Sequence, residues 1–325
     1  MIFVGWDGGG TKTEVCLTDE AGRLLARESF GPLNPNGADR SRMEKTVGDA
    51  LRFMADHGVT GETCGGFVIG MAGISNHAAA GWLREALARA GWQGPLTLAG
   101  DQQIALAGAI EGHGAILIAG TGSVCFGRTP AGETFRVGGY GHLIDDVGSG
   151  YAIGREILMA AVRAEDGRAA PTLLRDRLYA EMGFTAAEDL VTWLYAPGRE
   201  KREIAALARL LPEALEQRDP AAEGIAERAG EDLADLAVTA WRKSGMTDGE
   251  LAMTGSILLH VSAIRGRVAA RMREAYPEVC LMHPRGTPAE GAAKMAREPE
   301  GGSGAEGGLG GDRKAPQNSL EEIKL

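Results

Sequence analysis

Two glycine- and threonine-rich turns, each flanked by apolar runs typical of strands, organise the N-terminal part of this chain. The first turn, residues 8–12, joins the runs 2–6 and 13–17, and the second, residues 120–123, joins the runs 115–119 and 124–127. Each set predicts an antiparallel hairpin. Because the two sets lie about 110 residues apart, we interpret them as a short internal repeat and expect two lobes of related architecture.

The remaining pattern predicts an α/β fold in which helices cover the sheets. Helices are expected at 39–57, 78–90, 258–275, 289–297 and over most of 150–244, and strands at 67–69, 96–99, 251–254 and 278–282. The expected domains are an N-terminal lobe, a C-terminal lobe whose last helix packs back on the first lobe, and a disordered tail rich in glycine and charge. Their bounds are 1–113, 114–298 and 299–325.

The first turn has the composition of a phosphate-binding loop. Three successive glycines, Gly8 to Gly10, allow a tight turn and a close approach of the backbone to a ligand, and their N–H groups can surround an anion. Lys12 is not placed as in a Walker A loop, and Thr13 occupies the third glycine position of a dinucleotide fingerprint. A hairpin-type phosphate loop remains, with a plain β-turn as the alternative.

Asp7 stands at the mouth of this turn. A carboxylate there would repel a nucleotide unless a cation intervened, so Asp7 is a candidate for organising Mg²⁺, directly or through water. A turn-capping role is the alternative. The second turn, Gly120-Thr121-Gly122-Ser123, offers the same chemistry from the second lobe. Two such hairpins across a cleft would hold one polyphosphate from both sides.

Asp101 and a glycine-rich run supply further polar chemistry. Asp101 follows a predicted strand, where ligands bind in α/β sheets, and would accept the proton of an alcohol in phosphoryl transfer. Helix capping is the alternative for this residue. Residues 138–150 form the densest polar, glycine-rich stretch of the folded part. They would hydrogen-bond a polyol, unless they form a plain surface loop; His142 among them is no evidence of a metal.

Charge and cysteine content argue against several classes of protein. The 34 basic and 44 acidic residues give a net charge of −10, which disfavours a nucleic-acid partner. The apolar runs are too short for a signal peptide or a membrane span, so we expect a cytoplasmic protein. The four cysteines form no C-x-x-C pair, and three lie in apolar runs, where burial as small hydrophobes is expected.

Together these motifs resemble the superfamily of sugar kinases, heat-shock ATPases and actin, and within it the N-acetylglucosamine kinase branch that also holds the BadF/BadG/BcrA/BcrD ATPases. The matching stretches are VGWDGGGTKTEVCL, GPLNPN, LAGDQQIALAG, GAILIAGTGSVCFG, GGYGHLIDDVGSGYAIGRE, MTGSILL and PAEGAAKMA. They occur in the family's order and span about residues 2–297. The resemblance implies a two-lobed actin-like fold of ribonuclease H-like lobes, with a nucleotide cleft between them.

The resemblance also implies ATP and Mg²⁺ as cofactors, a sugar as substrate and, by analogy, a homodimer. The ATP contacts it implies are Gly9, Gly10, Thr11, Lys12, Thr121, Gly122, Gly255 and Ser256. The sugar contacts it implies are Asn34, Asp101, Ser123, Gly139, Tyr140, Gly141 and Asp146. Asp101 would be the catalytic base, and Asp7 would help to organise the magnesium.

The implied function is ATP-dependent phosphorylation of an amino sugar at its 6-hydroxyl, with N-acetylglucosamine first and glucosamine or N-acetylmuramic acid as alternatives. The chain departs from the family pattern at Val124, Asp145, Val147 and Arg218, which leaves the phosphate turns intact and bears on the choice of sugar. Two rival classes remain. One is an ATPase that activates a redox partner through an iron–sulfur centre, against which the scattered cysteines argue. The other is a non-catalytic sugar sensor.

Overall fold

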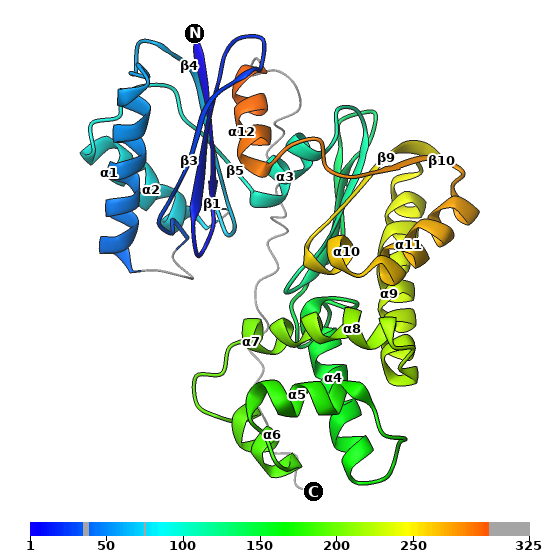
Figure 1. Ribbon diagram of the computed structural model, residues 1–325. Coiled ribbons are helices and arrows are strands. Elements are labelled where there is room, and N and C mark those ends of the chain that lie inside the picture. Colours follow the sequence, from blue (N-terminus) through cyan, green and yellow to red (C-terminus); the bar gives the residue numbers. More distant parts are fainter. Residues whose placement is uncertain (35–38, 75, 299–325) are drawn as a thin grey trace, which may run out of the picture.

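The computed structural model describes residues 1–34, 39–74 and 76–298, and it contains two five-stranded sheets in two lobes (Figure 1). The first sheet has the order β3-β2-β1-β4-β5, with β1 (Ile2–Gly8), β2 (Thr13–Thr18), β3 (Leu24–Phe30), β4 (Cys64–Met71) and β5 (Thr97–Ala99). The second has the order β8-β7-β6-β9-β10, with β6 (Gly114–Ala119), β7 (Ser123–Arg128), β8 (Thr134–Gly138), β9 (Asp248–Thr254) and β10 (Glu278–Met282). The predicted tail, 299–325, lies outside the described residues.

The two sheets share one topology. In each sheet the central strand, β1 or β6, pairs antiparallel with the strand that follows it and parallel with the strand on its other side, β4 or β9. The edge strands correspond as well, since β3 and β8 close one side and β5 and β10 close the other. This correspondence confirms that the short sequence repeat reflects two lobes of related architecture.

Helices cover both faces of the first sheet. On one face lie α1 (Arg40–Asp56) and α2 (His77–Arg89), whose Met54 and Leu83 are fully buried against a core that contains Trp6. On the other face lie α3 (Asp101–Ala109) and α12 (Pro288–Arg297). The contact of α12 with β1 needs a glycine, because a Cβ at Gly5 would lie 2.1 Å from the carbonyl oxygen of Ala289.

The second lobe continues into a helical region below its sheet (Figure 1). This region contains α4 (Gly150–Glu165), α5 (Leu173–Met182), α6 (Ala187–Leu194), α7 (Lys201–Ala206), a 3₁₀ turn (Leu207–Leu210) and α8 (Leu211–Glu216). Beside the sheet lie α9 (Pro220–Ser244), α10 (Ser256–His260) and α11 (Ser262–Ala275). The single helix expected at 258–275 is wrong. Two helices meet at Val261, whose extended backbone (φ −110°, ψ 88°) interrupts the helical hydrogen bonds.

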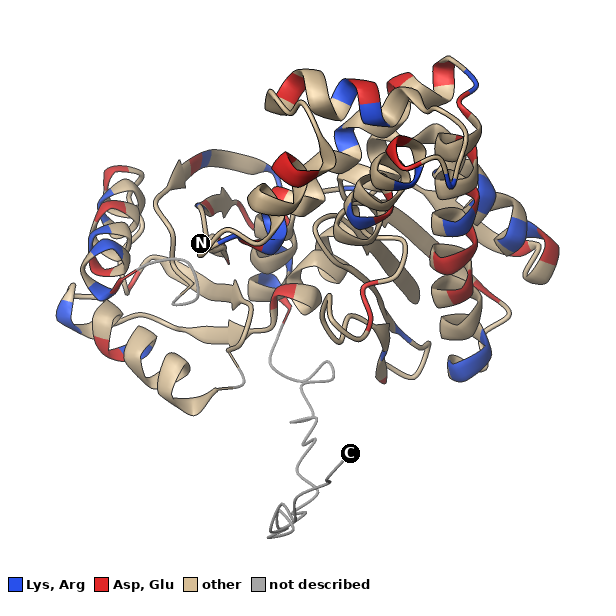
Figure 2. Cartoon of the chain, turned by 90° about the horizontal axis from the view of Figure 1, so that it is seen from below, with Lys and Arg blue, Asp and Glu red and all other residues tan. Residues whose placement is uncertain are grey.

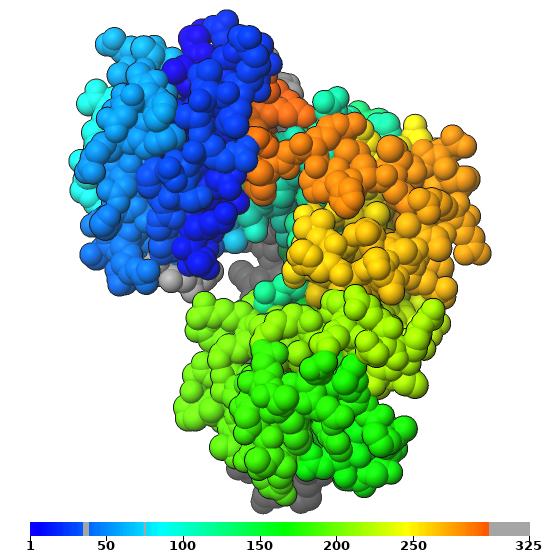
Figure 3. All heavy atoms as spheres, viewed as in Figure 1, coloured from blue at the N-terminus to red at the C-terminus, as the bar shows by residue number. Residues whose placement is uncertain are grey.

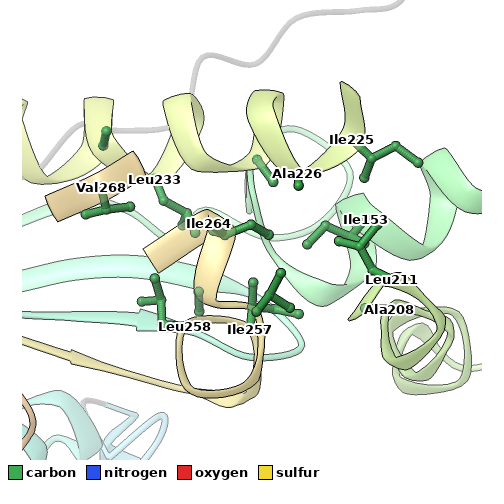
Figure 4. Packing of buried hydrophobic residues seen from close by; sticks show 14 of the residues in the cluster. Ile153, Ala208, Leu211, Ile225, Ala226, Leu233, Ile257, Leu258, Ile264 and Val268 are labelled. Carbon is green, nitrogen blue, oxygen red and sulfur yellow. The ribbon is translucent and has the colours of Figure 1, made fainter. Parts of the chain in front are cut away.

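A core shared by α9, α10 and α11 anchors the end of β9. Ile257 and Leu258 of α10 point into the same apolar cluster as Leu233 of α9 and Ile264 of α11 (Figure 4). All four side chains are at most 4% exposed. This packing fixes the backbone that leaves β9, and therefore the position of Gly255.

Lys and Arg are interspersed with Asp and Glu along the outer helices (Figure 2). Many pair across helices, as Arg228 of α9 does with Glu156 of α4. Within the described part of the chain, none of the helices combines the length and the apolar character that a membrane span requires.

The molecule is hollowed between the first lobe and the helical region of the second (Figure 3). Helix α3 contributes to the packing of both lobes: its Ile104 lies with Val68 of the first sheet, and its Leu106 packs with Ile116 of the second. The chain division at residue 113 stays a prediction.

Candidate active site

The candidate site lies at the carboxyl ends of the parallel strands, where α/β sheets bind ligands. Strands β1, β4 and β5 are mutually parallel, so the first turn and Asp101, which follow β1 and β5, meet at one edge of the first sheet. Strands β6 and β9 are parallel too, which brings the second turn and Gly255 to one edge of the second sheet. Both hairpins turn at the open side of the molecule (Figure 1).

The first turn is closed by its own backbone. The Gly9 N–H donates to the Lys12 carbonyl at 3.0 Å, and a Cβ at Gly9 would lie 2.8 Å from that same oxygen. The Gly9 carbonyl accepts from the backbone N–H groups of Leu33 (3.1 Å) and Asn34 (3.2 Å). Gly10, Thr11 and Lys12 are exposed. These hydrogen bonds fix the base of the turn, and the residues at its tip are accessible to a ligand.

Asn34 links this turn to the end of β4. Its side chain is buried, and its Nδ2 donates to the carbonyl of Ala72 at 3.3 Å. The sugar contact implied by the resemblance therefore lies beside the first turn, on the first lobe.

Asp7 is half-buried directly opposite Glu14 in the β1–β2 pair. Burial is the largest cause that raises the pKa of Asp7 to about 6; Glu14 and Asp101 raise it further, and Lys12 opposes them. An acidic side chain among like charges fits a divalent cation, which offsets that repulsion. The described residues hold no cluster of three or more His, Cys, Asp or Glu arranged to bind a metal. Magnesium keeps most of its waters in proteins and uses one or two carboxylates, so Asp7 alone could organise it through water.

Asp101 is the first residue of α3, and Gly100 is the N-cap. The Gln103 side chain accepts from the Gly100 N–H at 2.7 Å, so the capping alternative for Asp101 is wrong. Asp101 is exposed at the N-terminus of this helix.

The second turn is held by the start of α4. The Gly120 N–H donates to the Gly122 carbonyl at 2.9 Å, and the Gly120 carbonyl accepts from the Gly150 N–H at 2.7 Å. The Thr121 carbonyl accepts from the Tyr151 N–H at 3.3 Å. The Gly255-Ser256 turn packs directly against this hairpin, because a Cβ at Gly255 (φ +92°) would lie 2.3 Å from the carbonyl oxygen of Ala119. Ser256 is exposed beside it.

We define the substrate loop as residues 138–146, which run from the last residue of β8 toward α4. Asp146 is 5% exposed and adopts a left-handed backbone (φ 54°), which is uncommon outside glycine. Its Oδ1 accepts from the Ser123 N–H at 3.4 Å, and the Ser123 hydroxyl donates to the Val147 carbonyl at 2.6 Å. Ser123, Asp146 and the second turn are therefore in contact.

The structure thus forms two groups of predicted residues. The first lobe brings together Asp7, Gly9, Gly10, Thr11, Lys12, Asn34 and Asp101. The second lobe brings together Thr121, Gly122, Ser123, Gly139, Tyr140, Gly141, Asp146, Gly255 and Ser256.

Sequence reasoning missed two side chains next to these groups. Glu14 faces both Asp7 and Lys12, whose Nζ lies 3.6 Å from its carboxylate. Arg136 donates to carbonyls of the substrate loop. The period of two along β2 places residues 12 and 14 on one face and was sufficient to find Glu14.

The cysteines lie apart. Cys16, Cys64 and Cys125 are buried, and burial raises the pKa of the Cys16 thiol to about 11 and that of Cys125 to about 12. Cys280 is exposed on the edge strand β10. Inert buried thiols on separate strands do not form an iron–sulfur ligand set.

A family model described as the BadF/BadG/BcrA/BcrD ATPase family matches residues 4–296. The N-acetylmuramic acid/N-acetylglucosamine kinase of Clostridium acetobutylicum is 29% identical over 298 residues, which cover 90% of this chain and 97% of that protein. The N-acetyl-D-glucosamine kinase of Dictyostelium discoideum is 28% identical over 315 residues, with coverage of 91% and 97%.

A solved structure from Chromobacterium violaceum, described as a candidate N-acetylglucosamine kinase, is similar as well. It shares 25% identity at a TM-score of 0.72 and covers 91% of this chain and 99% of its own. This likeness confirms the two-lobed α/β fold of actin-like sugar kinases that the motifs led us to expect. The chain belongs to the BadF/BadG/BcrA/BcrD ATPase family.

Proposed function

We propose that this chain is an ATP-dependent kinase that phosphorylates an amino sugar at its 6-hydroxyl, with N-acetylglucosamine as the preferred substrate. The observation that carries the proposal is the pair of glycine hairpins, one on each lobe, with the exposed carboxylate of Asp101 at the strand ends beside the first. The names of both curated relatives support the sugar class. Glucosamine and N-acetylmuramic acid are the nearest alternatives.

The nucleotide would lie between the hairpins. Backbone N–H groups at Gly10 and Thr11 would bind its phosphates from the first lobe, and those at Thr121 and Gly122 from the second. Lys12 adds a positive charge at the first turn, and the Gly255-Ser256 turn would border the adenosine. Asp7 would hold magnesium through its water shell. When bound, that ion would neutralise phosphate charge and orient the phosphates.

The sugar would lie between Asp101 and the substrate loop. Asn34 on the first lobe and Ser123, Gly139, Tyr140, Gly141 and Asp146 on the second would hydrogen-bond its hydroxyls or pack on its ring. Asp101 would accept the proton of the 6-hydroxyl as the oxygen attacks the terminal phosphate, which gives a sugar 6-phosphate and ADP. We also propose a homodimer, by analogy with the fold alone. A cytoplasmic location stays the expectation from the short apolar runs.

The test is ATP consumption by the purified protein across a panel of hexoses, amino sugars, N-acetylated sugars and N-acetylmuramic acid. We expect turnover that depends on the sugar, with the largest kcat/KM for N-acetylglucosamine and a 6-phosphate as product by NMR. ATP hydrolysis at the same rate with and without a sugar would contradict the kinase proposal, and so would a lack of ATP consumption with every sugar of the panel. Iron bound to anaerobically purified protein would favour a redox activator instead.

A further inference from the structure

The substrate loop has a backbone that is costly to order. Gly138, Gly139 and Gly141 have positive φ angles of 75°, 76° and 98°, and Asp146 has 54°. Glycines in such conformations lose more chain entropy on ordering than any other residue. A loop of this kind stays in one conformation only when side-chain contacts offset that entropic cost.

Arg136, near the end of β8, holds the first half of the loop. Its Nε donates to the Gly138 carbonyl at 2.8 Å, and its Nη2 donates to the Gly139 carbonyl. Its guanidinium carbon lies 4.9 Å from the centroid of the Tyr140 ring, a cation–π arrangement. One side chain thus fixes two left-handed glycines and the orientation of the aromatic ring.

Asp145 holds the same segment from its other end. Its Oδ2 accepts from the Tyr140 N–H at 3.0 Å, and its own N–H donates to the Gly141 carbonyl at 2.8 Å. Asp145 therefore closes a short backbone loop between Tyr140 and Gly141 and itself.

The ring of Tyr140 is held yet exposed. The residue is 67% exposed, and one face of the ring is occupied by Arg136, which leaves the other face for a ligand. The flat, weakly polar C–H face of a pyranose is the chemistry that packs on such a ring. Asp146 at the end of the loop contacts Ser123 at the second turn. This contact also fixes the position of the loop relative to the second turn.

We infer that Arg136 and Asp145 are positioning residues that fix the substrate loop in its binding conformation and present Tyr140 to the sugar ring. The inference rests on the proposed function and adds two side chains that act through the loop backbone and the Tyr140 ring. A loop that is ordered before the sugar binds does not pay the entropic cost of ordering on binding, so the affinity for the sugar is higher. The rate of the chemical step should not change.

The test combines kinetics with amide hydrogen exchange on Arg136→Met, Arg136→Lys, Asp145→Ala and the wild type. We expect Arg136→Met and Asp145→Ala to raise the KM for the sugar about tenfold or more, with kcat and the KM for ATP within about twofold. Exchange in the loop peptide should accelerate in both variants. Arg136→Lys, which keeps the cation but loses the two-point contact, should fall between them and the wild type.

Arg128→Met is the matched control. Arg128 lies on β7 of the same sheet and also donates to a glycine carbonyl, that of Gly112 at 2.9 Å, at the far end of the strand. We expect wild-type constants and loop exchange for this variant.

Three outcomes would overturn the inference. If amide exchange in the loop is unchanged in Asp145→Ala, the loop does not need this side chain to stay ordered. If exchange is faster but the KM for the sugar is unchanged, the order of the loop does not contribute to sugar binding. A kcat that falls with the sugar KM unchanged would assign the side chains to the chemical step instead. A wild type that shows no sugar-dependent turnover refutes the proposed function separately, because the exchange measurement needs no substrate. If Arg136→Met does not fold, Asp145→Ala alone decides.

Discussion

At the scale of single residues, the first turn stands beside an unbalanced set of acidic side chains. Asp7 and Glu14 lie opposite each other across two antiparallel strands, where like charges destabilise a sheet, and Asp101 adds to the same field. Lys12 is the cation that opposes them most directly at Asp7. A protein keeps such repulsion where a ligand relieves it, so these acids carry a stability cost that serves function.

The first prediction concerns the pH dependence of that cost. The pKa of Asp7 is about 6 in the folded protein and 3.8 ordinarily, so the folded state favours the protonated form. The cost of ionising Asp7 is therefore absent below about pH 4 and complete above about pH 6. We expect Asp7→Asn to raise the free energy of unfolding by about 1–3 kcal/mol at pH 8 without magnesium. At pH 4 the gain should vanish.

Urea unfolding at the two pH values, with EDTA present, measures this difference. Magnesium with ATP should stabilise the wild type and leave Asp7→Asn nearly unaffected, since the variant lacks the carboxylate. A variant that is destabilised at pH 8 would show that Asp7 makes a structural contact instead.

The second prediction concerns the proposed base. Asp101→Asn keeps size and polarity but cannot accept a proton, so turnover should fall by about 10²–10⁴-fold. The KM for ATP should stay within about twofold, because the nucleotide contacts that we propose lie on the hairpins. Steady-state kinetics with N-acetylglucosamine check it. Asp176→Asn, at an exposed first-turn position of α5, is the control and should keep full turnover; near-normal turnover of Asp101→Asn would remove Asp101 from its role.

The sequence was informative about these residues to different degrees. Glycine runs and an acid after a buried strand are local patterns, so the turns and Asp101 could be found from the sequence. The contact between Ser123 and Asp146, 23 residues apart, and the burial of Asn34 under the first turn depend on tertiary packing. No local pattern encodes them, and only the family resemblance pointed to those positions.

At the scale of elements, α12 packs closely on the first lobe because glycines line the contact. It lies on α3 and β1 so closely that a Cβ at Gly291 would meet the Ile104 carbonyl oxygen at 2.0 Å. Most strands and most helices were predictable from hydrophobic period and end signals, whereas the edge strand β8 and the break at Val261 were not. Apolar residues continue at helical spacing through Ile257, Leu258 and Ile264, because both short helices pack on α9, so the pattern hides the break.

The third prediction compares two helical glycines. Gly→Ala in a helix is ordinarily stabilising by up to about 1 kcal/mol. We expect that gain for Gly266→Ala in α11, where a Cβ would have no neighbour within 4 Å. Gly291→Ala in α12 should instead destabilise by about 1–3 kcal/mol, because backbone atoms cannot yield. Thermal unfolding of the two variants measures both, and equal shifts would contradict the tight contact of α12 with α3.

At the scale of the whole molecule, the same sheet topology occurs in both lobes, and one nucleotide would have to contact a turn from each. The strand orders place a glycine turn at the same edge of each sheet, yet the turns belong to different lobes with a hollow between them (Figure 3). The repeat in the sequence predicted the two lobes. It could not predict their arrangement, because that depends on α3, which packs on both sheets.

The last prediction follows from this separation. Backbone N–H groups must come within about 3 Å of a phosphate oxygen to bind it, so we expect one triphosphate held by both turns to draw the lobes toward each other. Small-angle X-ray scattering should give a smaller radius of gyration with a non-hydrolysable ATP analogue and N-acetylglucosamine together than with either alone. Closure also excludes water, so ATP hydrolysis without sugar should stay slow.

Gly9→Val tests whether the turn causes that closure. Its Cβ would lie 2.8 Å from the Lys12 carbonyl, which distorts the first turn while the second stays intact. We expect this variant to keep the larger radius with both ligands present and to lose sugar-dependent turnover. A wild type whose radius does not change, although both ligands raise its melting temperature, would mean that the two hairpins do not hold one nucleotide between them.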